Sequence, residues 1–90
     1  MHNKVYRIEY TKEALKYLLK MPSERAEDIR SAFYRLAQWV PTNLDIRRLQ
    51  GFSTPTFWLR VGGYRAIFRY EEDRIVLVVL TVWPRWDVYK

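Results

Sequence analysis

The stretch that decides the fold is Phe57-Trp58-Leu59-Arg60-Val61-Gly62-Gly63-Tyr64-Arg65-Ala66-Ile67-Phe68. It contains two runs of aromatic, aliphatic and arginine residues, separated by Gly62 and Gly63. Both glycines tolerate the positive φ angles that a two-residue hairpin turn requires. The stretch therefore predicts a β-hairpin whose turn fixes the register, with Val61 opposite Tyr64.

Alternation along the two strands divides the hairpin side chains between the two faces of the sheet. One face receives Trp58, Arg60, Arg65, Ile67 and Arg69. The other face receives Phe57, Leu59, Val61, Ala66 and Phe68. The second face is the natural partner for a helix, and the first is free to carry chemistry.

The same register places Arg60 directly opposite Arg65. Like charges that face each other across a strand pair destabilise a sheet. A fold keeps such a pair most readily when an anion, or a carboxylate from a partner, lies between the two guanidinium groups. The alternative is two solvated arginines that splay apart.

The residues before the hairpin predict a strand and two helices. Alternation over 4–10 indicates a first strand, and Thr11 is a suitable N-cap for a helix over 12–20. That helix is expected to place three leucines on one face, Leu15, Leu18 and Leu19. Pro22 interrupts it and starts a second helix over 23–39, because proline is tolerated in a first turn but not inside a helix.

The second helix carries one continuous apolar stripe, formed by Ala26, Ile29, Phe33, Leu36 and Val40. Such a stripe is typical of a core-facing helix. Beyond the loop 41–45, we expect a short extended piece at 46–49 and a strand over 74–82 that is apolar on both faces. The fold class is α+β: one small domain over 1–90, in the order β-α-α-β-β-β, with two N-terminal helices packed on one face of a mostly antiparallel sheet.

The chain has 90 residues, of which 49% are hydrophobic, and no cysteine. This composition excludes a disordered chain, disulfides and a thiolate metal site. The longest strictly apolar run, 75–80, is too short to span a bilayer, and the first residues do not form a secretion signal. We expect a cytoplasmic protein with no metal, no cofactor and no membrane association.

The charge of the chain is concentrated in its second half. The net charge is +6, and residues 46–70 hold five arginines and no acidic residue. The guanidinium fork matches a phosphate group through two parallel hydrogen bonds. A basic region of this kind favours a polyanionic partner, most simply nucleic acid. The alternative is a soluble protein that is merely basic.

Three segments together resemble the RelE/ParE superfamily of bacterial and archaeal toxins. These are Arg47-Arg48-Leu49-Gln50-Gly51, the hairpin over 57–68, and the ending Pro84-Arg85-Trp86-Asp87-Val88-Tyr89. The superfamily pattern has a Leu-x-Gly before an aromatic-x-Leu-Arg-Val-Gly-x-Tyr-Arg hairpin, and a terminal Arg-x-x-Val-Tyr. The resemblance covers essentially the whole chain.

The RelE branch of this superfamily implies a ribosome-dependent endoribonuclease that cuts messenger RNA and inhibits translation. It also implies a cognate antitoxin, RelB-like or of another family, that holds the toxin inactive. Carried over by position, the catalytic residues are Arg60, Arg65, Arg85 and Tyr89. The residues expected to bind RNA or the ribosome are Arg47, Arg48, Trp58, Arg69, Trp86 and Lys90.

The chain departs from the family pattern at two positions. Many relatives have a histidine or lysine before the terminal arginine, where this chain has Pro84, and some have a lysine where it has Trp58. The single histidine, His2, is expected to be inert, so imidazole acid–base catalysis is excluded. The candidates for proton transfer that remain are Tyr89, Lys90 and Asp87.

Two other functions remain open on the sequence. ParE-type relatives share the fold, do not cut RNA and poison DNA gyrase as binding proteins. A degenerate member would bind RNA or an antitoxin without cleaving. The ending that contains Arg85 and Tyr89 favours the ribonuclease branch, because ParE relatives tend to lack it.

Overall fold

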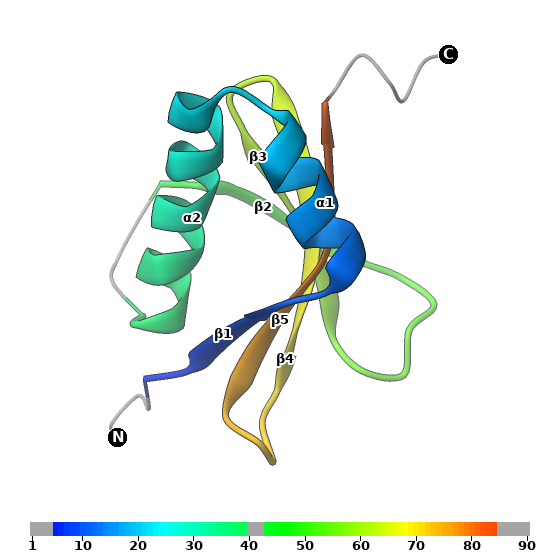
Figure 1. The fold of residues 1–90 in the computed structure, drawn as a ribbon. Helices are drawn as coiled ribbons and strands as arrows, with labels where there is room; N and C mark the ends of the chain where they lie inside the picture. The colour runs from blue at the N-terminus through cyan, green and yellow to red at the C-terminus, as the bar shows by residue number, and fades with distance from the viewer. Residues whose placement is uncertain (1–4, 40–42, 85–90) are drawn as a thin grey trace.

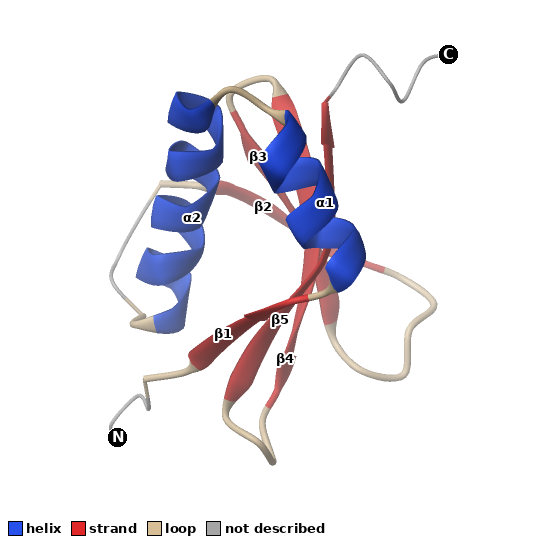
Figure 2. Cartoon of the chain, viewed as in Figure 1, coloured by secondary structure: helices blue, strands red, loops and turns tan. Residues whose placement is uncertain are grey.

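The computed structural model describes residues 5–39 and 43–84, and two helices lie on one face of a five-stranded sheet (Figures 1 and 2). The elements along the chain are β1 (Arg7–Tyr10), α1 (Lys12–Lys20), α2 (Ser23–Ala37), β2 (Asp45–Leu49), β3 (Thr56–Val61), β4 (Tyr64–Glu71) and β5 (Val76–Pro84). The predicted fold class is confirmed. The short piece expected at 46–49 is a full strand, because all five residues of β2 pair with β3.

The strand order in the sheet is β1-β5-β4-β3-β2. β1 runs parallel to β5, and the other three pairings are antiparallel. β5, predicted to be apolar on both faces, lies inside the sheet between β1 and β4. It starts two residues later than predicted, because Ile75 has a φ of 55° and belongs to the turn after β4.

The hairpin register is confirmed, with Val61 opposite Tyr64 and Arg60 opposite Arg65. Gly62 adopts a φ of 57° in the turn, which explains why a residue without a Cβ atom stands there. The turn lies at the end of the sheet where β5 finishes, since Tyr64 pairs with Pro84 (Figure 1).

Thr11 caps α1 and joins it to the sheet. Its hydroxyl oxygen accepts a hydrogen bond from the backbone N–H of Ala14 at 3.1 Å and donates one to the Leu80 carbonyl at 2.7 Å. α2 ends at Ala37, two residues earlier than predicted, because Trp39 has a φ of 59° and leaves the helical conformation. No helix in 5–39 or 43–84 is long and apolar enough to cross a membrane.

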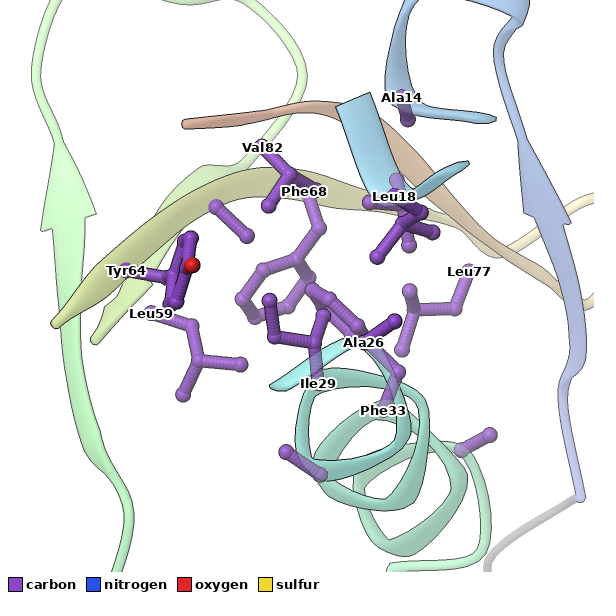
Figure 3. Packing of buried hydrophobic residues seen from close by; sticks show 14 residues of the cluster. Ala14, Leu18, Ala26, Ile29, Phe33, Leu59, Tyr64, Phe68, Leu77 and Val82 are labelled. Atoms are coloured by element: carbon purple, nitrogen blue, oxygen red, sulfur yellow. The ribbon is translucent and has the colours of Figure 1, made fainter. Parts of the chain in front are cut away.

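The core lies between the two helices and the sheet (Figure 3). Its centre is an edge-to-face pair of Phe33 from α2 and Phe68 from β4, with ring centroids 5.3 Å apart. The leucine face expected on α1 is wrong. The helix buries Ala14 and Leu18, whereas Leu15 and Leu19 are 43% and 79% exposed. Ala14 and Leu18 are four residues apart and share the helix face that meets the core, whereas Leu15 and Leu19, one residue further on, lie on a neighbouring face that is exposed.

Candidate nucleic-acid interface

The face of the sheet opposite the helices carries two parallel rows of side chains across β2, β3 and β4. In one row Asp45, Arg60 and Arg65 are successive cross-strand neighbours. In the next row Arg47 is paired with Trp58, which is paired in turn with Ile67. Cross-strand partners point to the same face, so residues that are up to 20 positions apart in the chain converge.

Three guanidinium groups surround one indole ring. The guanidinium carbons of Arg65, Arg47 and Arg60 lie 5.3, 5.8 and 5.9 Å from the ring centroid of Trp58. Each of these contacts is attractive, because the face of an indole carries a negative quadrupole. We call these four residues the arginine cluster. The indole holds three like charges together on a surface that faces away from the core.

The anion expected between Arg60 and Arg65 is not found among the described residues, and Arg60 is instead paired with Asp45 on its other side, on strand β2. The Arg60 Nε and Nη2 atoms donate hydrogen bonds of 3.1 and 2.7 Å to the Oδ2 atom of Asp45. Asp45 lies one residue before the acid-free segment 46–70, so the charge pattern of that segment did not reveal its carboxylate. The signal that could have found it was the antiparallel pairing of 45–49 with 56–60, which sets Asp45 opposite Arg60.

Arg65 is different from Arg60 because no carboxylate in the described part of the chain reaches it. Its Nε atom is inaccessible to solvent and has no hydrogen-bond partner among the described residues. A buried donor without a partner costs about 1–3 kcal/mol. Arg47 likewise forms no ion pair within 5–39 and 43–84. Within the described residues, Arg47 and Arg65 are therefore the two arginines of the cluster that no carboxylate occupies.

Two of the predicted RNA-binding arginines lie elsewhere. Arg48 follows Arg47 in β2 and belongs to the helix-side face by alternation, where its cross-strand neighbour is Phe57. Arg69 lies on the open face but at the opposite end, and its Nε and Nη2 atoms donate to Glu71 at 2.9 and 2.7 Å. The structure thus brings Arg47, Trp58, Arg60 and Arg65 together and separates the other two.

Arg69 belongs to a chain of ion pairs that we call the ion-pair network. Glu71 also pairs with Arg74, and Arg74 in turn pairs with Glu9. Glu9 pairs with Arg7, which completes the network. Hydrogen bonds from Arg69 and Arg74 hold the pKa of the Glu71 carboxyl below its ordinary value of 4.5. A hollow of about 800 Å³ at this end of the sheet is lined by Arg69, Glu71 and aromatic side chains, and by none of the arginine cluster.

Four predicted site residues, Arg85, Trp86, Tyr89 and Lys90, lie outside the described residues, as do His2 and Asp87. The last residues of β5 are described, and Trp83 is the cross-strand neighbour of Arg65. Strand β5 therefore ends beside the arginine cluster. Among the described residues, no group of three His, Cys, Asp or Glu side chains is placed to hold a metal ion.

A family model described as the ParE toxin of a type II toxin–antitoxin system, parDE, matches residues 8–89. The chain belongs to the ParE toxin family. No curated protein sequence matches it. This ParE-family chain is also similar in structure to solved toxins named RelE, so membership of the RelE/ParE superfamily, expected from the hairpin, is confirmed.

One such structure is an archaeal RelE–RelB complex from Pyrococcus horikoshii, with 25% identity and a TM-score of 0.77 over 91% of this chain and 97% of that one. The RelBE2 toxin–antitoxin complex from Mycobacterium tuberculosis has 23% identity and a TM-score of 0.73, over 91% of this chain and 100% of that one. The isolated Escherichia coli RelE toxin has 21% identity and a TM-score of 0.69, over 93% of this chain and 90% of that one. The last two likenesses show the fold of the ParE-family chain.

Proposed function

We propose that this protein is the toxin of a toxin–antitoxin pair, and that it inhibits translation by cutting messenger RNA on the ribosome. One observation carries the proposal. Arg65, whose Nε atom lacks a partner among the described residues, lies beside the indole of Trp58 on the open face of the sheet. A guanidinium group that no described carboxylate occupies, beside an aromatic platform, is suited to a phosphate and its neighbouring base.

In the proposed reaction the ribose 2′-oxygen attacks the adjacent phosphorus. A bond forms between the 2′-oxygen and phosphorus, the bond from phosphorus to the 5′-oxygen breaks, and the proton of the 2′-hydroxyl is transferred to the departing 5′-oxygen. The products are a 2′,3′-cyclic phosphate and a 5′-hydroxyl end. The charge that develops on the phosphate oxygens is the part of the reaction that fixed guanidinium groups stabilise.

Each residue of the proposed site has a distinct role. Arg65 contacts the scissile phosphate, Arg47 a neighbouring phosphate, and Trp58 stacks on a base. By resemblance, Arg85 matches the terminal arginine of the family, and Tyr89 matches the terminal tyrosine near the nucleophile or a stacked base. Arg60 already donates two hydrogen bonds to Asp45.

The site is strong in charge and weak in proton transfer. The chain has one histidine, His2, which is not part of the proposed site. In-line geometry must therefore supply much of the rate, and holding a reactant pre-oriented contributes several kcal/mol. We infer that the ribosome provides this geometry by binding the message in its decoding site.

The proposed inhibitor is a cognate antitoxin that covers the basic face of the sheet. The structures from P. horikoshii and M. tuberculosis are toxin–antitoxin complexes, which supports a partner of this class. The arginine cluster is complementary to an acidic segment, because it holds three arginines and one aspartate neighbour.

The test compares purified toxin on two substrates, a messenger RNA on ribosomes with an empty A site and the same RNA without ribosomes. We expect cleavage only on ribosomes, with 5′-hydroxyl ends, and no inflection of the single-turnover rate near about pH 6.5, where a free imidazole titrates. Efficient cutting of the naked RNA would contradict ribosome dependence.

The matching family model favours a second candidate, a ParE-type poison of DNA gyrase that does not cut RNA. A gyrase supercoiling assay run on the same preparation separates the two candidates. Inhibition of supercoiling without RNA cleavage would establish the second candidate. Binding to RNA or antitoxin with neither activity would identify a degenerate member.

A further inference from the structure

Asp45 occupies one of the three guanidinium groups of the arginine cluster. Both hydrogen bonds from Arg60 end on the same oxygen atom, Oδ2. The other two guanidinium groups, on Arg47 and Arg65, have no carboxylate among the described residues. The three arginines therefore differ in how much donor capacity they retain for a ligand.

A carboxylate and a phosphate compete for the same edge of a guanidinium group, because both accept its parallel N–H donors. The side chains of Arg60 and Asp45 are 37% and 39% exposed, so solvent screens their attraction. A polyanion can open such a screened ion pair, and only then is the Nε–Nη2 edge of Arg60 available to a phosphate.

We propose that Asp45 is an internal counter-anion that withholds Arg60 from the phosphate backbone, and so limits how tightly the arginine cluster binds RNA. This inference rests on the proposed function and names a residue that sets the selectivity of the same site. Free RNA therefore contacts only two guanidinium groups, those of Arg47 and Arg65, and its binding in the absence of ribosomes is weak. Asp45 acts through Arg60 and is a positioning residue.

The test is Asp45→Asn, which removes the charge and keeps the shape of the side chain. Binding of a 12-nucleotide single-stranded RNA is measured without ribosomes, at several salt concentrations. One additional phosphate contact steepens the slope of log affinity against log salt by about 0.7, which corresponds to about fivefold tighter binding at 0.1 M salt. A defect in folding alone would not steepen this slope.

The matched control is Glu71→Gln in the ion-pair network. It removes the same charge from a carboxylate that also holds an arginine at 2.7 Å on the same sheet face. We expect this control to leave the salt slope unchanged. The double variant Asp45→Asn/Arg60→Gln should return to the wild-type slope, since the gain requires the released Arg60. Thermal melts verify that each variant is folded, and Asp45→Ser serves if Asp45→Asn does not fold.

Equal slopes for Asp45→Asn and Glu71→Gln would overturn the inference, and so would weaker RNA binding by a folded Asp45→Asn. If neither wild type nor variant binds RNA, the proposed function fails, and elution from phosphocellulose still decides the role of Asp45. Elution of Asp45→Asn at higher salt than Glu71→Gln, which has the same net charge, supports the inference. Elution at the same salt overturns it.

Discussion

The two ends of the open sheet face use the same residue type for different purposes. The arginine cluster, near the β3–β4 turn, has three arginines around Trp58, and only Arg60 among them is paired with a described carboxylate, that of Asp45. The ion-pair network, near the β4–β5 turn, also has three arginines but two glutamates, and each of its arginines has a carboxylate partner. On this face, counter-ions and not exposure distinguish the arginines that are paired within the fold from those that we propose to bind a ligand.

The residues on which the two groups of arginines rest also differ. The network spreads over Val76 and Val78 of β5, which are buried although they face away from the main core. The cluster is built around Trp58, an aromatic ring that attracts cations without neutralising them. The network therefore covers apolar strand residues, whereas the cluster keeps positive charge available.

Replacing one arginine at each end gives the largest contrast. Arg65→Ala should lower the rate of cleavage on ribosomes by about 10²–10³-fold, because it removes a fixed charge from the developing phosphate charge. Arg74→Ala removes an equal charge from the same sheet face, and we expect it to leave the rate unchanged. Single-turnover cleavage on programmed ribosomes measures both. Similar losses in the two variants would mean that total charge, and not position, decides activity.

Trp58→Ala tests whether the aromatic platform distinguishes the cluster from the network. Stacking of a base contributes about 1–3 kcal/mol, so RNA affinity should fall about 5–150-fold. Trp58→Phe keeps an aromatic face and should recover part of the loss. The measurement is fluorescence anisotropy with a labelled single-stranded RNA. An unchanged affinity for the alanine variant would show that Trp58 does not stack on a base.

The hairpin was predictable because two adjacent glycines and strict alternation leave one register. From that register the sequence placed Arg60 opposite Arg65, and Trp58 on the same face. The sequence did not predict the role of Asp45, because β2 and β3 are joined by the loop 50–55 and not by a tight turn that would set their register. It also did not separate Arg69 from the cluster, because the partner Glu71 lies one residue beyond the acid-free segment 46–70.

The α1 helix shows the limit of hydrophobic patterning. Three leucines in nine residues suggested an apolar face, yet the tether from Thr11 to the Leu80 carbonyl fixes how the helix meets β5. That contact joins residues 69 positions apart, and no local pattern encodes it. The rotation of a short helix is set by such tertiary contacts, so Ala14 is buried in place of Leu15.

The network should also differ from the cluster in its pH dependence. The pKa of Glu71 is lowered in the folded state, chiefly by the hydrogen bond from Arg69. A lowered carboxyl pKa stabilises the fold above the ordinary value of 4.5, and that contribution is lost as pH falls through the folded pKa. The melting temperatures of wild type and Glu71→Gln should therefore differ at pH 7 and converge as pH falls through the folded pKa of Glu71. A difference that does not shrink as the solution is acidified would assign the effect to packing.

The smallest expected effect is at the outer end of the network. Arg7 lies 3.3 Å from Glu9, and their side chains are 69% and 40% exposed. An exposed pair of this kind is worth about 0–1 kcal/mol, so Arg7→Gln should lower the melting temperature by no more than about 4–8 °C, and less in high salt. Calorimetry at low and high salt measures this. If Arg7→Gln lowers the melting temperature as much as Glu71→Gln does, the five residues of the network act as one cooperative unit. The network would then differ from the arginine cluster in that its contacts are energetically linked. A smaller cost would mean that the structural role of this end rests on Glu71, the only glutamate that pairs with two arginines of the network at 2.7 Å or less.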